Sequence, residues 1–249
     1  MKISVITTCL NSEETIEEAV VSVLSQTHSD IEYVVIDGGS QDGTVSILNR
    51  YSDRIDILVS EPDDGIYDAM NKGLELATGD VIAILNSDDV YAHSDVLLKV
   101  VEIMRSGELD AVFGDVEYFT SDKPDKTVRR YNSASFSPRR ISWGWMPAHP
   151  ALFFRRHVYD RIGKFRTDYR IAGDFEFVAR AFRDGKLKYH YLRGVLVRMR
   201  TGGVSTAGWR NTLLLNREVL RACRENGIPT NIFKVLSKYP AKLLEYLRA

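Results

Sequence analysis

Two adjacent carboxylates, Asp88 and Asp89, follow the apolar run VIAIL at residues 81–85, with only Asn86 and Ser87 in between. Proteins bind hard cations such as Mg2+ and Mn2+ with one or two carboxylates, and water and substrate phosphate complete the shell. The same short oxygen-bearing residues also begin helices and form turns, because they satisfy free backbone N–H groups. A metal site and a turn are therefore both open, and the surrounding elements decide between them.

Apolar runs of strand length alternate with amphipathic runs of helical spacing in the first half of the chain. The strand-like runs are ISVITT, IEYVVID, IDILVSE and DVIAIL. Strand followed by helix, four times, predicts an α/β fold with a mostly parallel central sheet and helices on both faces. Ligands of such sheets bind outside the carboxyl ends of the strands. The residues just past those ends are 8–11, 37–40, 61–64 and 86–89.

The second half is less regular. We expect a strand in LDAVFGDVEYF, a basic loop-rich segment, a strand and short helix in ALFFRRHVYDRIG, a helix in DFEFVARAFRDG and a strand in KLKYHYLRGVLVRMR. Two further helices are predicted at about 208–226 and 230–248.

Charge divides the chain. Residues 1–122 contain 25 Asp and Glu against 6 Lys and Arg, whereas residues 123–249 contain 9 against 27. An acidic half suits cations and a basic half suits phosphates, nucleic acid or an anionic membrane, although the two halves could also simply meet across the fold. Cys9 and Cys223 have no disulfide or metal-site spacing, and no apolar run reaches membrane-spanning length, so we expect a cytoplasmic protein.

Several motifs in one order resemble the family 2 glycosyltransferases, nucleotide-sugar enzymes of the GT-A fold. They are SVITTCLNSEETIEEAVVSVLSQT, EYVVIDGGSQDGT, EPDDGIYDAMNKGLELATGD, LNSDD and AGDFEF. EPDDGIYDAMNKG is similar to the branch that assembles bacterial cell-surface polysaccharides of the colanic-acid type. The resemblance implies a GT-A catalytic domain at 1–205, with a nucleotide-sugar-binding half at 1–115 and an acceptor half at 116–205, and a C-terminal helical extension at 206–249.

By this resemblance LNSDD corresponds to the family's metal motif. Asp89 is then the first metal ligand and Asp88 the second, while Ser87 and Asp88 also contact the donor. The cofactor expected is Mn2+ or Mg2+, because a divalent cation stabilises a departing diphosphate as a Lewis acid.

The resemblance also implies a donor site for a UDP or GDP sugar. Its expected contacts are Thr8, Leu10, Asn11, Asp37, Gly65, Asp68, Lys72, Ser87 and Asp88. Many family members have an aromatic residue in place of Leu10 and an Asp or Asn in place of Gly38, which leaves uridine, guanosine and deoxythymidine donors open. Asp37 has an alternative as a turn residue, and Lys72 as part of a solvated helix face.

Asp174, in IAGDFEF, matches the family's catalytic base, which takes the proton of the acceptor hydroxyl in an inverting transfer. The alternative is an N-cap. Acceptor contacts are expected from Trp143, Trp145, His149 and Glu176, and the alternative for the aromatic residues and the histidine is burial in the core.

The function predicted is metal-dependent inverting transfer of a sugar to a glycan or lipid-linked acceptor. Alternatives are a nucleotidyltransferase of similar sheet architecture and a non-catalytic basic adaptor for membrane or nucleic acid; we expect no nucleic-acid partner, because no groove-reading motif is present. Residues 230–249 have the pattern of an amphipathic basic helix, which predicts a peripheral position at the inner face of the cell membrane. Packing of this helix onto the domain is the alternative.

Overall fold

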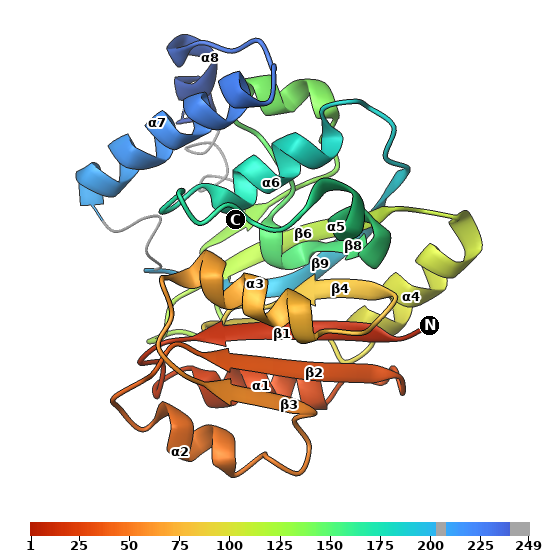
Figure 1. Ribbon diagram of the computed structural model, residues 1–249, viewed down its shortest axis with the longest axis vertical. Helices are drawn as coiled ribbons and strands as arrows, with labels where there is room; N and C mark the ends of the chain where they lie inside the picture. Colours follow the sequence, from red (N-terminus) through yellow and green to blue (C-terminus); the bar gives the residue numbers. More distant parts are fainter. Residues whose placement is uncertain (203–207, 240–249) are drawn as a thin grey trace.

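The computed structural model describes residues 1–202 and 208–239 of the 249-residue chain. Nine strands of this part form one sheet in the order β3-β2-β1-β4-β8-β6-β9-β5, with β7 paired to β6 (Figure 1). The first elements are β1 (Ile3–Cys9), α1 (Ile16–Leu24), β2 (Ile31–Asp37), α2 (Thr44–Asn49), β3 (Ile57–Ser60), α3 (Ile66–Leu76) and β4 (Val81–Ile84). The four repeats of strand and helix predicted from the sequence are confirmed up to β4, and the fourth helix is α4 (Val96–Gly107).

Strands β1 to β4 form the parallel part of the sheet, because β1 pairs in parallel with β2 and β4, and β2 with β3. All seven residues of β1 are buried, which is typical of a strand covered on both faces. Ile6 packs into the core cluster that holds α3, whereas Ile3 and Val5 pack with α1. The predicted covering of both faces by helices is therefore confirmed here.

The second half makes the sheet mixed. Its strands are β5 (Asp89–Tyr91), β6 (Ala111–Phe119), β7 (Arg129–Tyr131), β8 (Leu152–Arg155) and β9 (Tyr189–Arg200). β8 is antiparallel to both β4 and β6, and β5 is antiparallel to β9. The mostly parallel pairing predicted from the sequence thus describes β1 to β4 best. β5 has only three residues and a partner strand far along the chain, so no local pattern indicates it.

The remaining elements lie around this half. They are η1 (Pro138–Trp143), η2 (His149–Ala151), α5 (Arg156–Ile162), α6 (Gly173–Phe182), α7 (Gly208–Glu225) and α8 (Ile232–Leu236). Helices α7 and α8 lie at the top of Figure 1, beyond α6 and opposite the β3 edge. Val219 and Cys223 of α7 and Val235 of α8 join the core cluster of α6, so the apolar face of these helices packs onto the domain.

None of the helices described is both long and apolar enough to cross a bilayer. The helix predicted at about 208–226 is confirmed as α7. The stretch 230–249 is described only as far as Tyr239, and its last ten residues lie outside the described part.

The order β3-β2-β1-β4 places the site. The chain leaves β1 toward β2 on one side, and β4 joins β1 on the other, so the strand order reverses between β1 and β4. Open α/β sheets bind ligands at such a switch point, outside the carboxyl ends of the strands. Thr8 at the end of β1 and residues 86–89 beyond β4 lie at this point.

Candidate active site

Asp88 and Asp89 follow β4, and Asp89 begins β5, where it is paired with Met199 of β9. The sequence predicted a turn outside the core for this pair, but Asp89 is only 1% exposed because β9 closes over it. Burial raises the pKa of Asp89 well above its ordinary value, and the adjacent charge of Asp88 raises it further. Burial also raises the pKa of Asp88. Asp89 is therefore a buried carboxylate, and the partly buried carboxylate of Asp88 lies next to it in the chain.

Two side chains close to Asp88 and Asp89 have buried oxygen atoms without a hydrogen-bond partner among the described residues. Asn86 donates from Nδ2 to Asp89 Oδ2 at 3.0 Å, and its own Oδ1 is buried with no hydrogen-bond partner in the described part of the chain. Thr8 Oγ1, near the end of β1, is likewise buried without a hydrogen-bond partner in that part of the chain. The Ser87 hydroxyl lies 2.9 Å from that of Ser12 and joins the two strand ends.

Arg200, the last residue of β9, provides positive charge beside the carboxylates, which partly offsets the increase in the pKa of both. Its guanidinium pairs with Glu18 at 2.7 Å and donates to the Ser121 hydroxyl at 3.0 Å. Its Nε is buried without a partner among the residues described. The neighbouring Arg198 is paired with Glu117 at 2.7 Å instead.

These residues fit a hard divalent cation. They offer two carboxylates and a free amide oxygen, and Mg2+ and Mn2+ prefer oxygen ligands. Over the ranges described, no group of three or more His, Cys, Asp or Glu side chains could hold a metal by itself. A cation here would therefore complete its shell with water and ligand phosphate, as Mg2+ usually does.

Asp37 is fully buried at the end of β2, and its carboxylate already accepts hydrogen bonds from neighbouring residues. It accepts hydrogen bonds from the Ser60 hydroxyl at 2.7 Å, from the backbone N–H groups of Gly39 and Ser40, and from the Ser40 hydroxyl. Burial raises its pKa, but these bonds outweigh burial and lower the pKa overall. Asp37 thus shapes the turn, as its alternative interpretation states.

The turn after β1 is more exposed than the turn after β2. Leu10 is 54% exposed at the end of β1. Asn11 has a left-handed backbone with φ of 48°, and its Oδ1 accepts from Gln41 N at 2.8 Å. Leu10 is therefore free to contact a ligand, while the Asn11 side chain supports the loop.

Gly65 precedes α3 with φ of 110°, a conformation that strongly favours glycine. Lys72, about two helical turns further on, pairs with Glu61 at 2.8 Å and lies 3.6 Å from Asp68. Its ammonium also donates to the Pro62 carbonyl. The lysine is therefore held in a charged cluster beside the third turn rather than on a freely solvated helix face.

Asp174 lies in the first turn of α6. The N-cap of α6 is Ala172 with no side-chain cap, so the alternative interpretation of Asp174 as an N-cap is wrong. Its Oδ1 accepts from the Phe175 backbone at 2.7 Å, and the Tyr67 hydroxyl of α3 lies 3.5 Å away. Burial raises the pKa of Asp174 to about 6, against the lowering effect of these hydrogen bonds. A carboxylate with such a pKa is suited to general base chemistry near neutral pH.

Two expected acceptor contacts lie in the core instead. Glu176 is 1% exposed and pairs with Arg180, its neighbour one turn along α6. His149 is buried edge-on against Phe165, and burial lowers its pKa to about 4, so it is neutral. His149 is therefore a core residue, as its alternative interpretation states. Glu176 anchors α6, because the positive charge of Arg180 compensates its buried negative charge.

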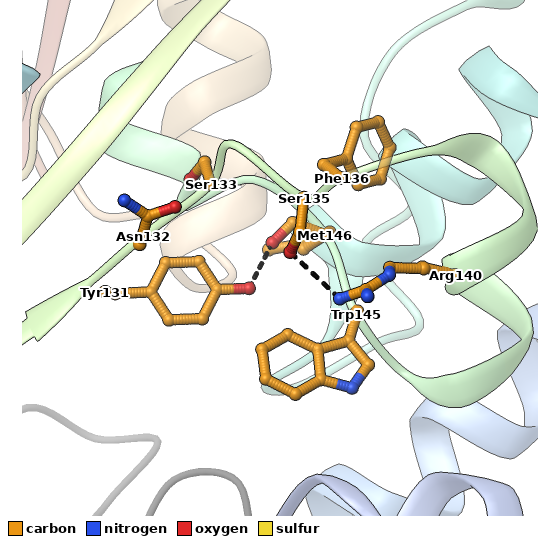
Figure 2. Close-up of a pocket in the computed structure, with 8 residues that line it drawn as sticks. All are labelled: Tyr131, Asn132, Ser133, Ser135, Phe136, Arg140, Trp145 and Met146. Atoms are coloured by element: carbon orange, nitrogen blue, oxygen red, sulfur yellow. Dashed lines mark hydrogen bonds between the residues drawn. The ribbon is translucent and has the colours of Figure 1, made fainter. Parts of the chain in front are cut away.

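The two tryptophans remain accessible. Trp143 is 44% exposed, with the Lys234 ammonium 5.5 Å from its ring. Trp145 stacks on Tyr131 at 6.0 Å and lines a small hollow with Ser135 and Arg140 (Figure 2). The Tyr131 hydroxyl donates to the Met146 carbonyl at 2.6 Å and fixes one wall of this hollow.

The family model for glycosyl transferase family 2 matches residues 4–186. The chain belongs to glycosyltransferase family 2. It is thus a glycosyltransferase, not a nucleotidyltransferase or a non-catalytic adaptor.

A PGL/p-HBAD biosynthesis glycosyltransferase of Mycobacterium bovis (strain BCG / Pasteur 1173P2) is 32% identical over 222 residues, which make up 88% of this chain and 82% of that protein. Glycosyltransferase AglE of Haloferax volcanii is 32% identical over 191 residues, 72% of this chain and 60% of that protein.

Solved structures agree on the GT-A fold. Staphylococcus aureus TarS 1-349 in complex with UDP-GlcNAc has a TM-score of 0.68 at 19% identity, covering 89% of this chain and 66% of that one. Mannosyltransferase PcManGT from Pyrobaculum calidifontis, in complex with GDP-Man and Mn2+, has a TM-score of 0.64 at 21% identity, covering 88% and 64%. This glycosyltransferase therefore spans somewhat less than two thirds of each of those chains.

Asn86 and Tyr67 were not predicted as site residues, but the structure places them against Asp89 and Asp174. Both lie inside motifs that carry the resemblance, LNSDD and EPDDGIYDAMNKG. Their positions in those motifs are the signal that could have drawn attention to them.

We predict that Asp89→Asn reduces metal-dependent sugar transfer at least about 100-fold, the effect of losing a group that stabilises transition-state charge. The thermal midpoint should stay equal or rise, because the change removes a buried charge next to Asp88. Transfer kinetics with Mn2+ and a melting curve measure the two effects. Asp122→Asn, in an exposed turn, is the matched control. Wild-type turnover in the Asp89 variant would reject the metal assignment.

We also predict that kcat rises with pH through about 6, the pKa of Asp174, because the base must be deprotonated to accept a proton. Asp174→Asn should keep donor affinity and lose most of the turnover, since donor binding does not require the base. Calorimetry and a pH profile of kcat check this. An equal loss of affinity and turnover would make Asp174 structural.

Proposed function

We propose that this family 2 glycosyltransferase is a metal-dependent inverting enzyme that moves a sugar from a nucleoside diphosphate sugar to a hydroxyl of a glycan or lipid-linked acceptor. The observation that carries the proposal is the buried Asp89 with the partly buried Asp88 beside it, at the switch point of the sheet. Two adjacent carboxylates whose pKa values are raised by burial favour a cation and the diphosphate that accompanies it.

The chemistry is a single displacement. Bound by Asp89 and Asp88, a divalent cation would supply Lewis acidity for departure of the diphosphate. Asp174 accepts the acceptor hydroxyl proton while that oxygen bonds to the anomeric carbon, and the bond from this carbon to the diphosphate oxygen breaks. Attack opposite the leaving group inverts the anomeric configuration. Arg200 adds positive charge on the diphosphate side.

The donor is a UDP or GDP sugar. TarS is solved with UDP-GlcNAc and PcManGT with GDP-Man and Mn2+, and both share the fold of this chain. The PcManGT complex supports Mn2+ as the cofactor, and Mg2+ shares its preference for oxygen ligands. Donor contacts come from Leu10 just past β1 and from Ser87 and Asp88 beyond β4, and Thr8 of β1 and Asn11 of the loop complete that edge.

The third turn and the acceptor side complete the proposal. Donor contacts are also proposed at the start of α3, from Gly65 and from the ion pair of Lys72 with Asp68, in which the ammonium carries the positive charge. Trp143 and Trp145 offer aromatic faces to acceptor sugars. Assembly of a bacterial surface polysaccharide of the colanic-acid type fits this chemistry, and a curated relative is named for PGL/p-HBAD biosynthesis.

A peripheral position at the inner face of the cell membrane is also proposed, through α8 and η1. Phe233 is 81% exposed, and Ile232, Leu236 and Trp143 are exposed beside it on these two contacting elements. Lys234 and the exposed Arg139 supply positive charge. Exposed apolar side chains interspersed with basic ones favour an anionic lipid surface.

We expect slow release of nucleoside diphosphate from one UDP or GDP sugar of a panel that also includes CDP and ADP sugars, only with Mn2+ or Mg2+ present. The reason is that the cation must offset the charge of both the carboxylates and the leaving group. Chromatography of the products measures it, and EDTA is the control. Release from every sugar without metal, or no release from any sugar with metal, would contradict the proposed function.

We expect Trp143→Ala combined with Phe233→Ala to weaken co-sedimentation with phosphatidylglycerol vesicles about tenfold at low salt, because each side chain buries apolar area in the interface. Point variants are preferable to truncation, because Val235 of α8 is part of the core. Leu76→Ala, a partly exposed position on α3, is the control. If the double variant and the Leu76→Ala control sediment equally well, this surface is rejected as the membrane contact.

A further inference from the structure

The segment just before α6 is held by a carboxylate from another helix. Glu218 of α7 accepts the backbone N–H of Arg170 at 2.8 Å on Oε1, and those of Ile171 and Ala172 at 2.9 and 2.8 Å on Oε2. The backbone N–H groups of Ala172, the N-cap of α6, and of the two residues before it need partners outside the helix. Glu218 is buried and accepts hydrogen bonds from all three.

The opposite side of the same segment is held by α3. The Tyr67 hydroxyl donates to the Ile171 carbonyl at 2.7 Å. The Tyr67 ring packs so closely on Gly173 that a Cβ there would lie 2.7 Å from it. Residues 171–173 are therefore fixed between α3 and α7, and Asp174 is the next residue along the chain.

The groups that face Asp174 from these elements are few. α3 contributes the Tyr67 hydroxyl, α6 contributes the Phe175 N–H, and α7 contributes the carboxylate of Glu218. Within the described ranges Glu218 forms no ion pair, so its negative charge acts on its surroundings without a cationic partner. Burial is the main reason that the pKa of Asp174 is raised, and the Glu218 charge raises it further.

We propose that Glu218 is a positioning residue for Asp174, so that α7 belongs to the catalytic unit of this glycosyltransferase. The match to the family model ends at residue 186, well before Glu218. Glu218 sets where Asp174 lies, through the backbone of 170–172, and it keeps the Asp174 carboxyl more basic through its charge. This inference rests on the proposed role of Asp174 as the base.

The test is Glu218→Gln. The amide keeps the size of the side chain, but its nitrogen cannot accept a hydrogen bond, so at least one of the three N–H bonds is lost. We expect kcat to fall about 10- to 100-fold, because small misplacements of a reacting group are costly, while the affinity for UDP or GDP with Mn2+ stays unchanged. Arg217→Gln, at an exposed position next to Glu218 on the same helix, is the control.

The pH profile separates positioning from general loosening. Removing the Glu218 charge lowers the pKa of Asp174, so the acidic limb of kcat shifts to lower pH in Glu218→Gln. Glu218→Asp keeps the negative charge. The acidic limb of its kcat profile should therefore lie closer to that of the wild type than the limb of Glu218→Gln does, even where kcat recovers only in part. A loosened fold would lower kcat without moving the limb.

Wild-type kcat and an unmoved limb in Glu218→Gln would overturn the inference, as would equal limbs in the Gln and Asp variants. A variant that fails to fold as Gln is replaced by the Asp variant, whose kcat must then fall with donor affinity intact. Full turnover in Asp174→Asn is a different result, because it would overturn the proposed function itself.

Discussion

The burial of Asp89 beside the partly buried Asp88, just past the end of β4, is the constraint on which the site depends. An ion removed from water loses several kcal/mol of solvation in a protein, and two like charges side by side add repulsion. Asp89 cannot escape to the surface, because β5 and β9 pair across it. Arg200 offsets only part of this charge, since it also pairs with Glu18. In the proposed function, a divalent cation with a diphosphate would offset this charge, so a feature that costs folding stability would favour ligand binding.

A second constraint links parts of the chain that lie far apart. Asp174 is placed by a short segment whose backbone is bound by Tyr67 from α3 and by Glu218 from α7. Helix α3 begins after β3, beside the proposed donor site, and α7 is the next described helix after β9, whose last residue, Arg200, lies beside Asp88 and Asp89. The proposed base is thus held by α3 and α7, and Asp89, the proposed metal ligand, by the pairing of β5 with β9.

The sequence predicted β1 to β4 and their helices well, because their hydrophobic periodicity is local and strong. It also predicted the family, since motifs in a fixed order carry it. It missed β5, whose pairing with β9 is long-range, and so placed Asp89 in an open turn. It also could not foresee that Glu176 meets Arg180 in the core, that Phe165 covers His149, or that Ser40 and Ser60 occupy Asp37. A polar residue type does not reveal its own burial, which is decided by partners distant in the chain.

The most direct test of the central claim is the affinity for Mn2+ in the presence of UDP or GDP, measured by calorimetry from about pH 5 to about pH 8. Burial raises the pKa of Asp88 and Asp89, so protons compete with the metal and must leave when it binds. The account predicts that affinity rises steeply with pH and that Mn2+ binding releases protons to the buffer. Nucleotide binding that is equally tight with EDTA, or Mn2+ affinity independent of pH, would contradict it.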